Sequence, residues 1–488
     1  MKPRIQTFPY LNTADIFAQL QNNHWPVWLD SCAHGKHQAR YDIISADPFI
    51  KIKTQGRETV VVSDASSYTT KDNPFLVVKD ILKKYPLENN TTLPFVGGAI
   101  GHFSYDLFEY LEDVPKYAER DLAFADMHIG VYDWAVIVDH HEQCCYLVQA
   151  GFSPDAKENW DTAYHTLSLC CTVIPRLDRG IHFAGTLENN ADSLAVKDLH
   201  CKVDPTVKPR DDSANNSDNA KSNFSRETYK HAFDKIQSYI HAGDCYQINL
   251  AQRFQMPCTD DPLLLYQHLR QKNPAPYSAF LRYEEGSLLS LSPERFLNVT
   301  NQLVETKPIK GTAPRHNDPL KDKQLAEELR GSIKNCAENV MIVDLLRNDL
   351  SKTCEPGSVK VPQLFALESY PAVHHLVSTV TGRLKPDQHS LDALMHAFPG
   401  GSITGAPKVR AMHIIEELEP HQRNVYCGAI GYIDFTGNMD TNIAIRTLLH
   451  HQDQLYCWAG GGIVADSNCD AEYLETLYKI QKIFPVTF

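Results

Sequence analysis

The sequence predicts an α+β fold in which mixed or antiparallel sheets are covered by helices. The chain has 488 residues, of which 43% are apolar, so it can bury a large core in two or three domains or in one oversized unit. Short segments with strand-like alternation follow one another through hairpin-like connections, and long segments with helical periodicity lie between them. This order lacks the strict strand–helix–strand alternation that a parallel sheet requires.

Composition narrows the class of protein. The chain carries 47 basic and 60 acidic side chains, a formal net charge of −13, which argues against nucleic acid as a partner. No run of about 18 apolar residues occurs, and the first residues lead into no signal-like apolar stretch, so we expect a cytoplasmic protein without a membrane partner. The 13 cysteines form no Cys-x-x-Cys pair, which indicates neither a disulfide framework nor a zinc site.

A polar segment separates two longer units. Between about residues 172 and 224 the sequence has no apolar periodicity, which predicts a linker or an insertion. The predicted organisation is therefore a first unit at 1–171, the polar segment at 172–224, and a second unit at 225–488.

The second unit begins with a well-marked helix. Ser225 is suited to cap its start, apolar residues follow at helical spacing, and Gly243 is suited to end it. A strand should follow through 246–254, with Gln247 facing away from the apolar side of that strand. Further strands are expected at 277–281, 302–309, 426–434 and 455–459, and further helices at about 319–350, 390–397, 405–418 and 469–483.

Lys310 is a candidate reactive amine. It lies in Pro308-Ile309-Lys310-Gly311-Thr312, an apolar strand-like run that we expect to end at the glycine. A lysine with the reference pKa of about 10.4 is almost fully protonated at neutral pH, so a nucleophilic role requires burial or a nearby cation. The alternative is an ordinary surface lysine.

Two acidic side chains, one before and one after Lys310 in the sequence, could act together with this amine. Glu294 lies between an apolar strand and the strand that leads to Lys310, although an ion pair with Arg295 would also explain it. Glu338 lies on a helix that becomes strongly apolar beyond it, so we expect its carboxylate to be poorly solvated and to need a cation.

A third acidic group lies near the carboxyl end of the chain. Glu472, Glu475 and Lys479 are spaced i, i+3 and i+7, which places two carboxylates and an ammonium on one stripe of a helix. Such a stripe could face a cavity, or Glu475 and Lys479 could form an exposed surface pair.

Two glycine-rich segments are expected to be loops that offer backbone amides to an anion, one at 400–408 and one at 460–467. The first is not a phosphate loop, because Lys408 stands three residues after Gly405 and no Ser or Thr follows it. With Arg446 and Lys479 as cations and glutamates that can hold Mg²⁺, the segments predict a site for a small polyanion.

Several motifs in this order resemble the chorismate-utilising enzymes. They are Tyr246-Gln247-Ile248-Asn249-Leu250, Ser292-Pro293-Glu294-Arg295-Phe296, the lysine motif at 308–312, Glu338 through Asp349, His374-His375-Leu376-Val377-Ser378, and Gly460 through Glu475. The resemblance implies a two-lobed α/β sandwich of large, mostly antiparallel sheets flanked by helices. It also implies that 1–171 is an amino-terminal lobe of the anthranilate synthase component I type and that 225–488 is the chorismate-binding catalytic domain.

Two positions indicate a branch within this family. Anthranilate synthases carry alanine where Lys310 stands, and isochorismate and salicylate synthases carry a lysine where Gln247 stands. The combination of Gln247 and Lys310 resembles the branch that converts chorismate and ammonia to 4-amino-4-deoxychorismate, for p-aminobenzoate and folate synthesis. The alternatives are an anthranilate synthase or a catalytically silent member that binds a small anion.

The resemblance also implies a role for each candidate residue. Lys310 would attack the ring at C2, Glu294 would act as general acid and base, and His375 would contact the region of the departing hydroxyl. Mg²⁺ would be held by Glu338 and Glu475, with Glu472 nearby. Substrate contacts would come from Gln247, Thr404, Arg446, Gly461, Gly462 and Lys479.

Partners follow from the same resemblance. A glutamine amidotransferase subunit would deliver ammonia, because this chain has no recognisable glutaminase cysteine motif, and Cys245 and Cys336 are better interpreted as core residues. The amino-terminal lobe of relatives can hold tryptophan, and Asp30, Ser31 and Tyr41 leave open whether this chain does.

Overall fold

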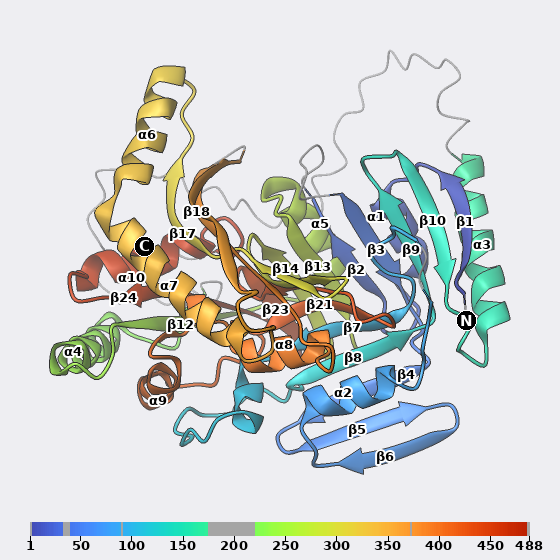
Figure 1. The fold of residues 1–488 in the computed structure, drawn as a ribbon, viewed down its shortest axis with the longest axis horizontal. Coiled ribbons are helices and arrows are strands. Elements are labelled where there is room, and N and C mark those ends of the chain that lie inside the picture. The colour runs from blue at the N-terminus through green and yellow to red at the C-terminus, as the bar shows by residue number, and fades with distance from the viewer. Residues whose placement is uncertain (1, 33–39, 89–90, 174–219, 371–372, 486–488) are drawn as a thin grey trace.

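The computed structural model describes residues 2–32, 40–88, 91–173, 220–370 and 373–485. Two large antiparallel sheets form the centre of the molecule, and helices flank them (Figure 1). The predicted fold class is therefore confirmed. Most of the predicted polar segment at 172–224 lies outside the described residues.

The first sheet takes strands from both ends of the chain. Its order is β1 (Arg4–Pro9), β10 (Cys144–Gln149), β9 (Trp134–Asp139), β3 (Tyr41–Ser45), β2 (Val27–Asp30), β13 (Tyr277–Arg282), β14 (Gly286–Ser292), β23 (Thr447–His451), β24 (Gln454–Ile463), β12 (Gln247–Pro257) and β11 (Lys221–Ser222), with β20 (Gly405–Ala406) on β12. The amino-terminal strands join the rest where β2 pairs with β13, in the register Asp30 with Ser278.

The second sheet also combines both halves. Its order is β17 (Ile309–Pro314), β19 (Val373–Arg383), β16 (Leu303–Thr306), β15 (Arg295–Thr300), β22 (Met439–Ile443), β21 (Ala429–Asp434), β7 (Gly98–Phe103), β8 (Met127–Tyr132), β4 (Ile50–Gln55), β5 (Glu58–Ser63) and β6 (Ser66–Thr70), with β18 (Lys360–Ser369) on β19. Here β7 pairs with β21. Both sheets cross the boundary between the two units. The main apolar core is therefore built from residues of both units as well.

Helices cover these sheets. They are α1 (Thr13–Leu20), α2 (Pro74–Leu82), α3 (Ala156–Val173), α4 (Arg226–Ala242), α5 (Pro262–Lys272), α6 (Pro319–Gly331), α7 (Ile333–Ser351), α8 (Ser390–Ala397), α9 (Lys408–Leu418) and α10 (Cys469–Ile480), with short 3-10 helices η1 (Tyr105–Tyr110) and η3 (Gly401–Ile403). In the described part of the chain, none of them has the length and apolar character needed to span a bilayer.

The helix predicted from Ser225 is confirmed. The Ser225 side chain accepts a hydrogen bond from the backbone of Thr228, whose own side chain bonds back to Ser225, and Gly243 ends the helix with a positive φ of 81°. Tyr229, Phe233 and Ile236 are its buried face.

The single helix expected at 319–350 is wrong. It is broken at Ser332, which has an extended backbone, follows Gly331 and caps α7 by accepting a hydrogen bond from the backbone of Asn335. Glycine weakens a helix, and a serine side chain stabilises the first turn of a new helix by capping it. Gly331 and Ser332 together therefore separate α6 from α7. As a result α6 projects from the body of the molecule (Figure 1).

Two further boundaries differ from expectation. The segment Gly460 to Gly462 belongs to strand β24, which runs past the predicted end at 459, so the expected glycine loop is wrong there. The helix expected from 405 begins at Lys408, because Gly405 and Ala406 pair with β12 as strand β20.

Candidate active site

Lys310 lies within strand β17 and reaches toward the turn formed by η3. Its Nζ donates a hydrogen bond to the backbone oxygen of Ser402 at 3.0 Å. Burial lowers the pKa of the amine, and the nearby carboxylates of Glu294 and Glu338 act in the opposite direction. Lys310 is half-buried and hydrogen-bonded to the turn, so it is not the ordinary surface lysine of the alternative.

The strand does not end at Gly311, as the sequence suggested, but continues to Pro314. Gly311 has a φ of +90°, and an added Cβ would lie 3.0 Å from Asn335 and from Leu329. The glycine is needed because α6 and α7 approach the backbone here, so it shapes the strand rather than terminating it.

Glu294 stands beside the amine. The residue is only 6% exposed, and its Oε1 accepts a hydrogen bond from Ser402 Oγ at 3.1 Å. Burial raises the pKa of the carboxyl to about 7, against the opposing effects of Lys310 and of the Ser402 hydroxyl. The alternative of an ion pair with Arg295 is wrong, because that guanidinium bonds to Glu305 and Asp440 instead.

Helix α10 brings its acidic stripe against β24. Glu472 is buried and accepts a hydrogen bond from Ser467 Oγ at 2.6 Å, and burial together with repulsion from Glu475 raises its pKa. Glu475 forms an ion pair with Lys479 at 2.7 Å in which both side chains are largely exposed, as the surface-pair alternative required. Lys479 also donates to the backbone oxygen of Gly460 at 2.9 Å, so the Glu475–Lys479 pair is held against strand β24.

The glycines of β24 leave room for neighbouring side chains. An added Cβ on Gly461 would lie 2.9 Å from Glu472 Oε2, and one on Gly462 would lie 2.1 Å from Gln247 Nε2. Gln247 is 2% exposed, and its Oε1 has no hydrogen-bond partner among the residues that the structure describes. Buried amide oxygens are rarely left unbonded, so this oxygen is available to a ligand.

Strand pairing indicates which backbone amides are open. Beyond Cys457, β24 has β12 on one side and no strand on the other within the described ranges. The backbone of Asn249 and Ala251 bonds away from β24, to Thr404 and Glu419. Their register partners are Gly462 and Gly460, whose N–H groups must point to the open edge, whereas that of Gly461 points toward β12.

Arg446 is a cation without a partner among the residues that the structure describes. It lies in the short connection between β22 and β23 with a positive φ of 50°, a conformation that costs a non-glycine residue energy and is enriched at functional sites. Its guanidinium makes no hydrogen bond or ion pair with any described residue, so it is free to bind an anion.

The remaining candidates lie on elements around Lys310. Glu338 is half-buried on α7, less than the sequence suggested, because the fully buried face of that helix begins at Asn339. His375 is 8% exposed on β19, and its Nδ1 lies 2.9 Å from Thr312 Oγ1. The hydroxyl of Thr404 is fully buried and donates to the backbone oxygen of Gly400 at 2.5 Å.

Sequence reasoning missed Ser402, which contacts both Lys310 and Glu294. Its only signal was its place in the glycine-rich segment at 400–408. Lys408 in the same segment is structural: it donates to Asp349 at 2.6 Å and to the backbone oxygen of Ala397 at 2.7 Å. Because the Lys408 amine is engaged in these contacts, it does not point to a phosphate as the lysine of a phosphate loop would.

The carboxylates can supply part of a metal site. Within the described ranges, no three His, Cys, Asp or Glu side chains stand close enough to hold a metal ion by themselves. Glu472 and Glu475 nevertheless both approach the position of a Cβ on Gly461, and burial, followed by repulsion from Glu475, raises the pKa of Glu472. Because Mg²⁺ is usually bound by one or two carboxylates, water and the substrate's own oxygens, these residues fit a magnesium ion.

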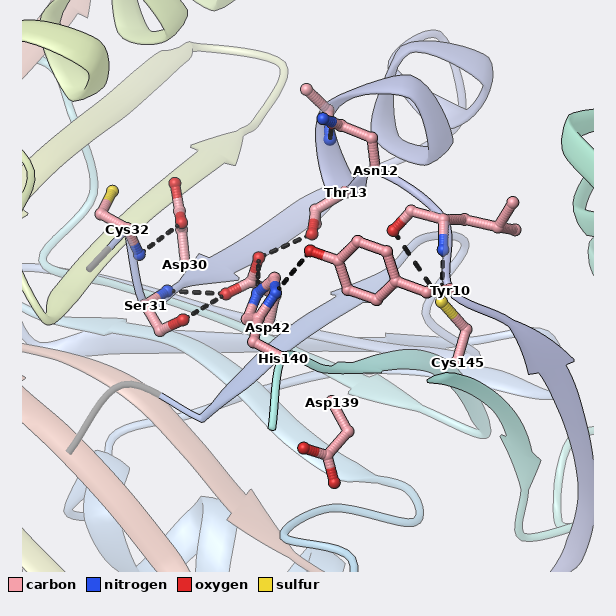
Figure 2. A network of polar contacts seen from close by, with 12 residues as sticks. Tyr10, Asn12, Thr13, Asp30, Ser31, Cys32, Asp42, Asp139, His140 and Cys145 are labelled. Carbon is pink, nitrogen blue, oxygen red and sulfur yellow. Dashed lines mark hydrogen bonds and ion pairs between the residues drawn. The ribbon is translucent and has the colours of Figure 1, made fainter. Parts of the chain in front are cut away.

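A separate cavity lies in the part of the molecule that contains the amino-terminal strands. It has a volume of about 1210 Å³ and is lined from both units, by Ser31 and Tyr41 on one side and by Tyr277, Arg295 and Lys307 among others on the other, but not by Lys310, Glu294 or Ser402. Figure 2 shows Ser31 bonded through both its N–H and Oγ to Asp42, which also accepts from Thr13. Asp30, which also lines this cavity, forms an ion pair with Arg270 at 2.5 Å. The side chains in this part of the cavity wall are therefore fixed by hydrogen bonds and an ion pair.

Comparison with known proteins agrees with this architecture. A family model described as chorismate binding enzyme matches residues 26–485. The chain is 44% identical to "Aminodeoxychorismate synthase component 1" of Salmonella typhimurium, over 99% of this chain and 98% of that protein. It is 45% identical to the protein of the same name from Escherichia coli, over 96% and 94%, and 34% identical to "Anthranilate synthase component 1" of Acetivibrio thermocellus, over 95% and 90%.

Solved structures show the same fold. Anthranilate synthase component I from Streptococcus pneumoniae superposes with a TM-score of 0.74 at 30% identity, covering 91% of this chain and 92% of that one. The menaquinone-specific isochorismate synthase MenF from Escherichia coli superposes with a TM-score of 0.67 at 15% identity, over 99% and 94%. The family that the sequence motifs indicated is thereby confirmed, and this chain belongs to the chorismate binding enzyme family.

Proposed function

We propose that this chain converts chorismate and ammonia to 4-amino-4-deoxychorismate and water through a covalent bond to Lys310. The observation that carries the proposal is the contact set of that amine, which is desolvated, bonded to Ser402 and close to a carboxyl whose pKa is about 7. Support comes from the relatives named aminodeoxychorismate synthase component 1, which are 44% and 45% identical over nearly the whole chain.

The chemistry uses Lys310 as nucleophile and Glu294 as proton donor. In the first step a bond forms between Nζ and ring C2 while the C4–oxygen bond breaks, and Glu294 protonates the departing hydroxyl as water. Ammonia then bonds to C4, the bond to Nζ breaks, and Glu294 takes up the proton that the new amine releases. A carboxyl with a pKa near 7 can act in both directions at neutral pH.

The other residues hold the substrate. Arg446 and Lys479 supply positive charge for its carboxylates, and the open N–H of Gly462 supplies a backbone donor, with Gly461 shaping the strand beside it. Gln247 contributes its unbonded oxygen and Thr404 a further substrate contact, while His375 lines the side of the departing hydroxyl. Glu338 and Glu475, with Glu472 nearby, would hold Mg²⁺ together with water and the substrate's own oxygens, and the ion would supply positive charge for a substrate carboxylate.

The proposal includes partners. Relatives carry the words "component 1" in their names, which supports a second subunit, and we infer from the family resemblance that this subunit is a glutamine amidotransferase that delivers ammonia. The cavity beside Ser31 and Tyr41 would take tryptophan as a regulator or structural ligand. We place the protein in the cytoplasm with the biosynthetic enzymes it resembles, without a nucleic-acid partner.

The test is product analysis. The purified chain is incubated with chorismate, Mg²⁺ and an ammonium salt, and the products are identified by liquid chromatography with mass spectrometry. Aminodeoxychorismate without pyruvate supports the proposal, whereas anthranilate or isochorismate contradicts it. In the wild-type chain, a covalent bond to the substrate should increase the mass of the peptide that contains Lys310. Lys310→Ala should abolish both the product and this mass increase. Unchanged turnover in this variant would exclude the covalent step.

A further inference from the structure

Ser402 contacts both groups that the proposed reaction requires, and it uses a different part of the residue for each. Its backbone oxygen accepts the hydrogen bond from Lys310 Nζ at 3.0 Å. Its hydroxyl donates to Glu294 Oε1 at 3.1 Å. The amine and the carboxyl are thus joined through one residue of a short 3-10 turn.

The turn is held from both sides. The backbone oxygen of Ile403 accepts from Asn249 Nδ2 at 2.9 Å and from Arg423 Nη1 at 3.1 Å. On the other side an added Cβ on Gly401 would lie 2.3 Å from a methyl carbon of Leu345, so helix α7 packs directly against the turn. A residue fixed in this way can orient its neighbours without paying the entropy of ordering a loop.

Arg423 gives the turn its anchor. The guanidinium is 1% exposed and forms a two-bond pair with Glu419, at 2.8 and 2.6 Å, while it also bonds to Asn249 and Ile403. These contacts connect β12, which carries Gln247, to the turn that carries Ser402.

We propose that Ser402 is a positioning residue that couples Glu294 to Lys310, its hydroxyl orienting the carboxyl through a hydrogen bond and its backbone oxygen aiming the amine. The inference deepens the proposed function and rests on it. Apart from Lys310 itself, groups of the described residues that act on Glu294 include Lys479, the backbone N–H of Ile309 and the thiol of Cys427, and within the described ranges none of these three is hydrogen-bonded to both Glu294 and Lys310.

The two contacts can be separated by substitution, because Ser402→Ala removes the hydroxyl and keeps the backbone oxygen. The protonation of Glu294 is followed by infrared difference spectroscopy of its carboxyl band, identified by its loss in Glu294→Gln. A wild-type midpoint near pH 7 should rise by about one pH unit in Ser402→Ala, since a hydrogen bond to a charged group is lost. Ser402→Thr, which keeps the hydroxyl, should restore the wild-type midpoint.

A matched control is Ser467→Ala. Ser467 also donates to a site carboxylate, but to Glu472, so the Glu294 midpoint should stay unchanged in this variant. If Ser402→Ala does not fold, Ser402→Cys replaces it, and its weaker donor should give an intermediate rise. An unchanged midpoint in Ser402→Ala or Ser402→Cys, or a Thr variant that behaves like the Ala variant, would overturn the proposal.

The infrared titration of Glu294 does not require the enzyme to turn over. It can therefore fail or succeed independently of the proposed function. The pH profile of kcat/KM should move with the infrared midpoint. A midpoint that moves while the profile does not would leave the Ser402 contact established and exclude Glu294 as the proton donor.

Discussion

Neutralising Glu294 should make the protein more stable above neutral pH. The carboxyl has a pKa of about 7 in the folded protein and an ordinary value of 4.5, so between these values the folded state binds a proton that the unfolded state has released. Stability from this group is therefore fully present below pH 4.5 and is lost as the pH rises through 7. The difference of about 2.5 pH units corresponds to about 3 kcal/mol.

The assay is denaturant unfolding of wild type and Glu294→Gln at a series of pH values between 4.5 and 8.5. Glutamine keeps the shape of the side chain and cannot ionise, so the variant should gain about 3 kcal/mol over wild type between the ends of this range. Subtracting the two curves removes other groups that titrate in the same window, such as Glu416, whose pKa burial also raises to about 7. Turnover of the variant should fall by about 100-fold or more.

Glu328→Gln is the control for the substitution itself. Glu328 is exposed on α6 and bonds only to Gln324 among the described residues, so its variant should show no such pH-dependent gain. A stability difference between wild type and Glu294→Gln that stays constant across the pH range would refute the reasoning, because it would mean that burial does not oppose ionisation of Glu294.

Three further outcomes follow from the geometry. Arg446→Gln should lower kcat/KM by about 10- to 100-fold through the loss of a charge-assisted contact, while Arg347→Gln on the exposed side of α7 should leave it unchanged; equal kinetics for both variants would remove Arg446 from the site. Gly462→Ala should reduce activity because its methyl would lie 2.1 Å from Gln247 Nε2, whereas Gly331→Ala, with no atom within 4 Å, should be neutral; full activity of the first variant would show that Gln247 can move aside. Chelation of Mg²⁺ should abolish turnover and leave the circular dichroism spectrum unchanged, and activity that persists in excess chelator would contradict a magnesium-dependent site.

Local sequence signals predicted much of the fold. The helix from Ser225 to Gly243 and strands β12 and β13 follow from capping residues and alternation, which act over a few residues, whereas the single strand expected at 302–309 is divided into β16 and β17. The break at Ser332 was missed because the apolar pattern continues on both sides of it, although Gly331 and Ser332 carried a weak signal. The strand at Gly460 to Gly462 was missed because glycine disfavours strands, and only pairing with β12 overrides that preference.

The sequence by itself determined which residue types the site contains: a lysine in an apolar strand, separate glutamates, an arginine and a glycine-rich segment. Tertiary structure decided the environment of each of them. Burial sets the raised pKa of Glu294 and the lowered pKa of Lys310, and it depends on elements far apart in the chain. Ser402 lies 108 residues from Glu294 and 92 from Lys310, so no local pattern could reveal that it joins them.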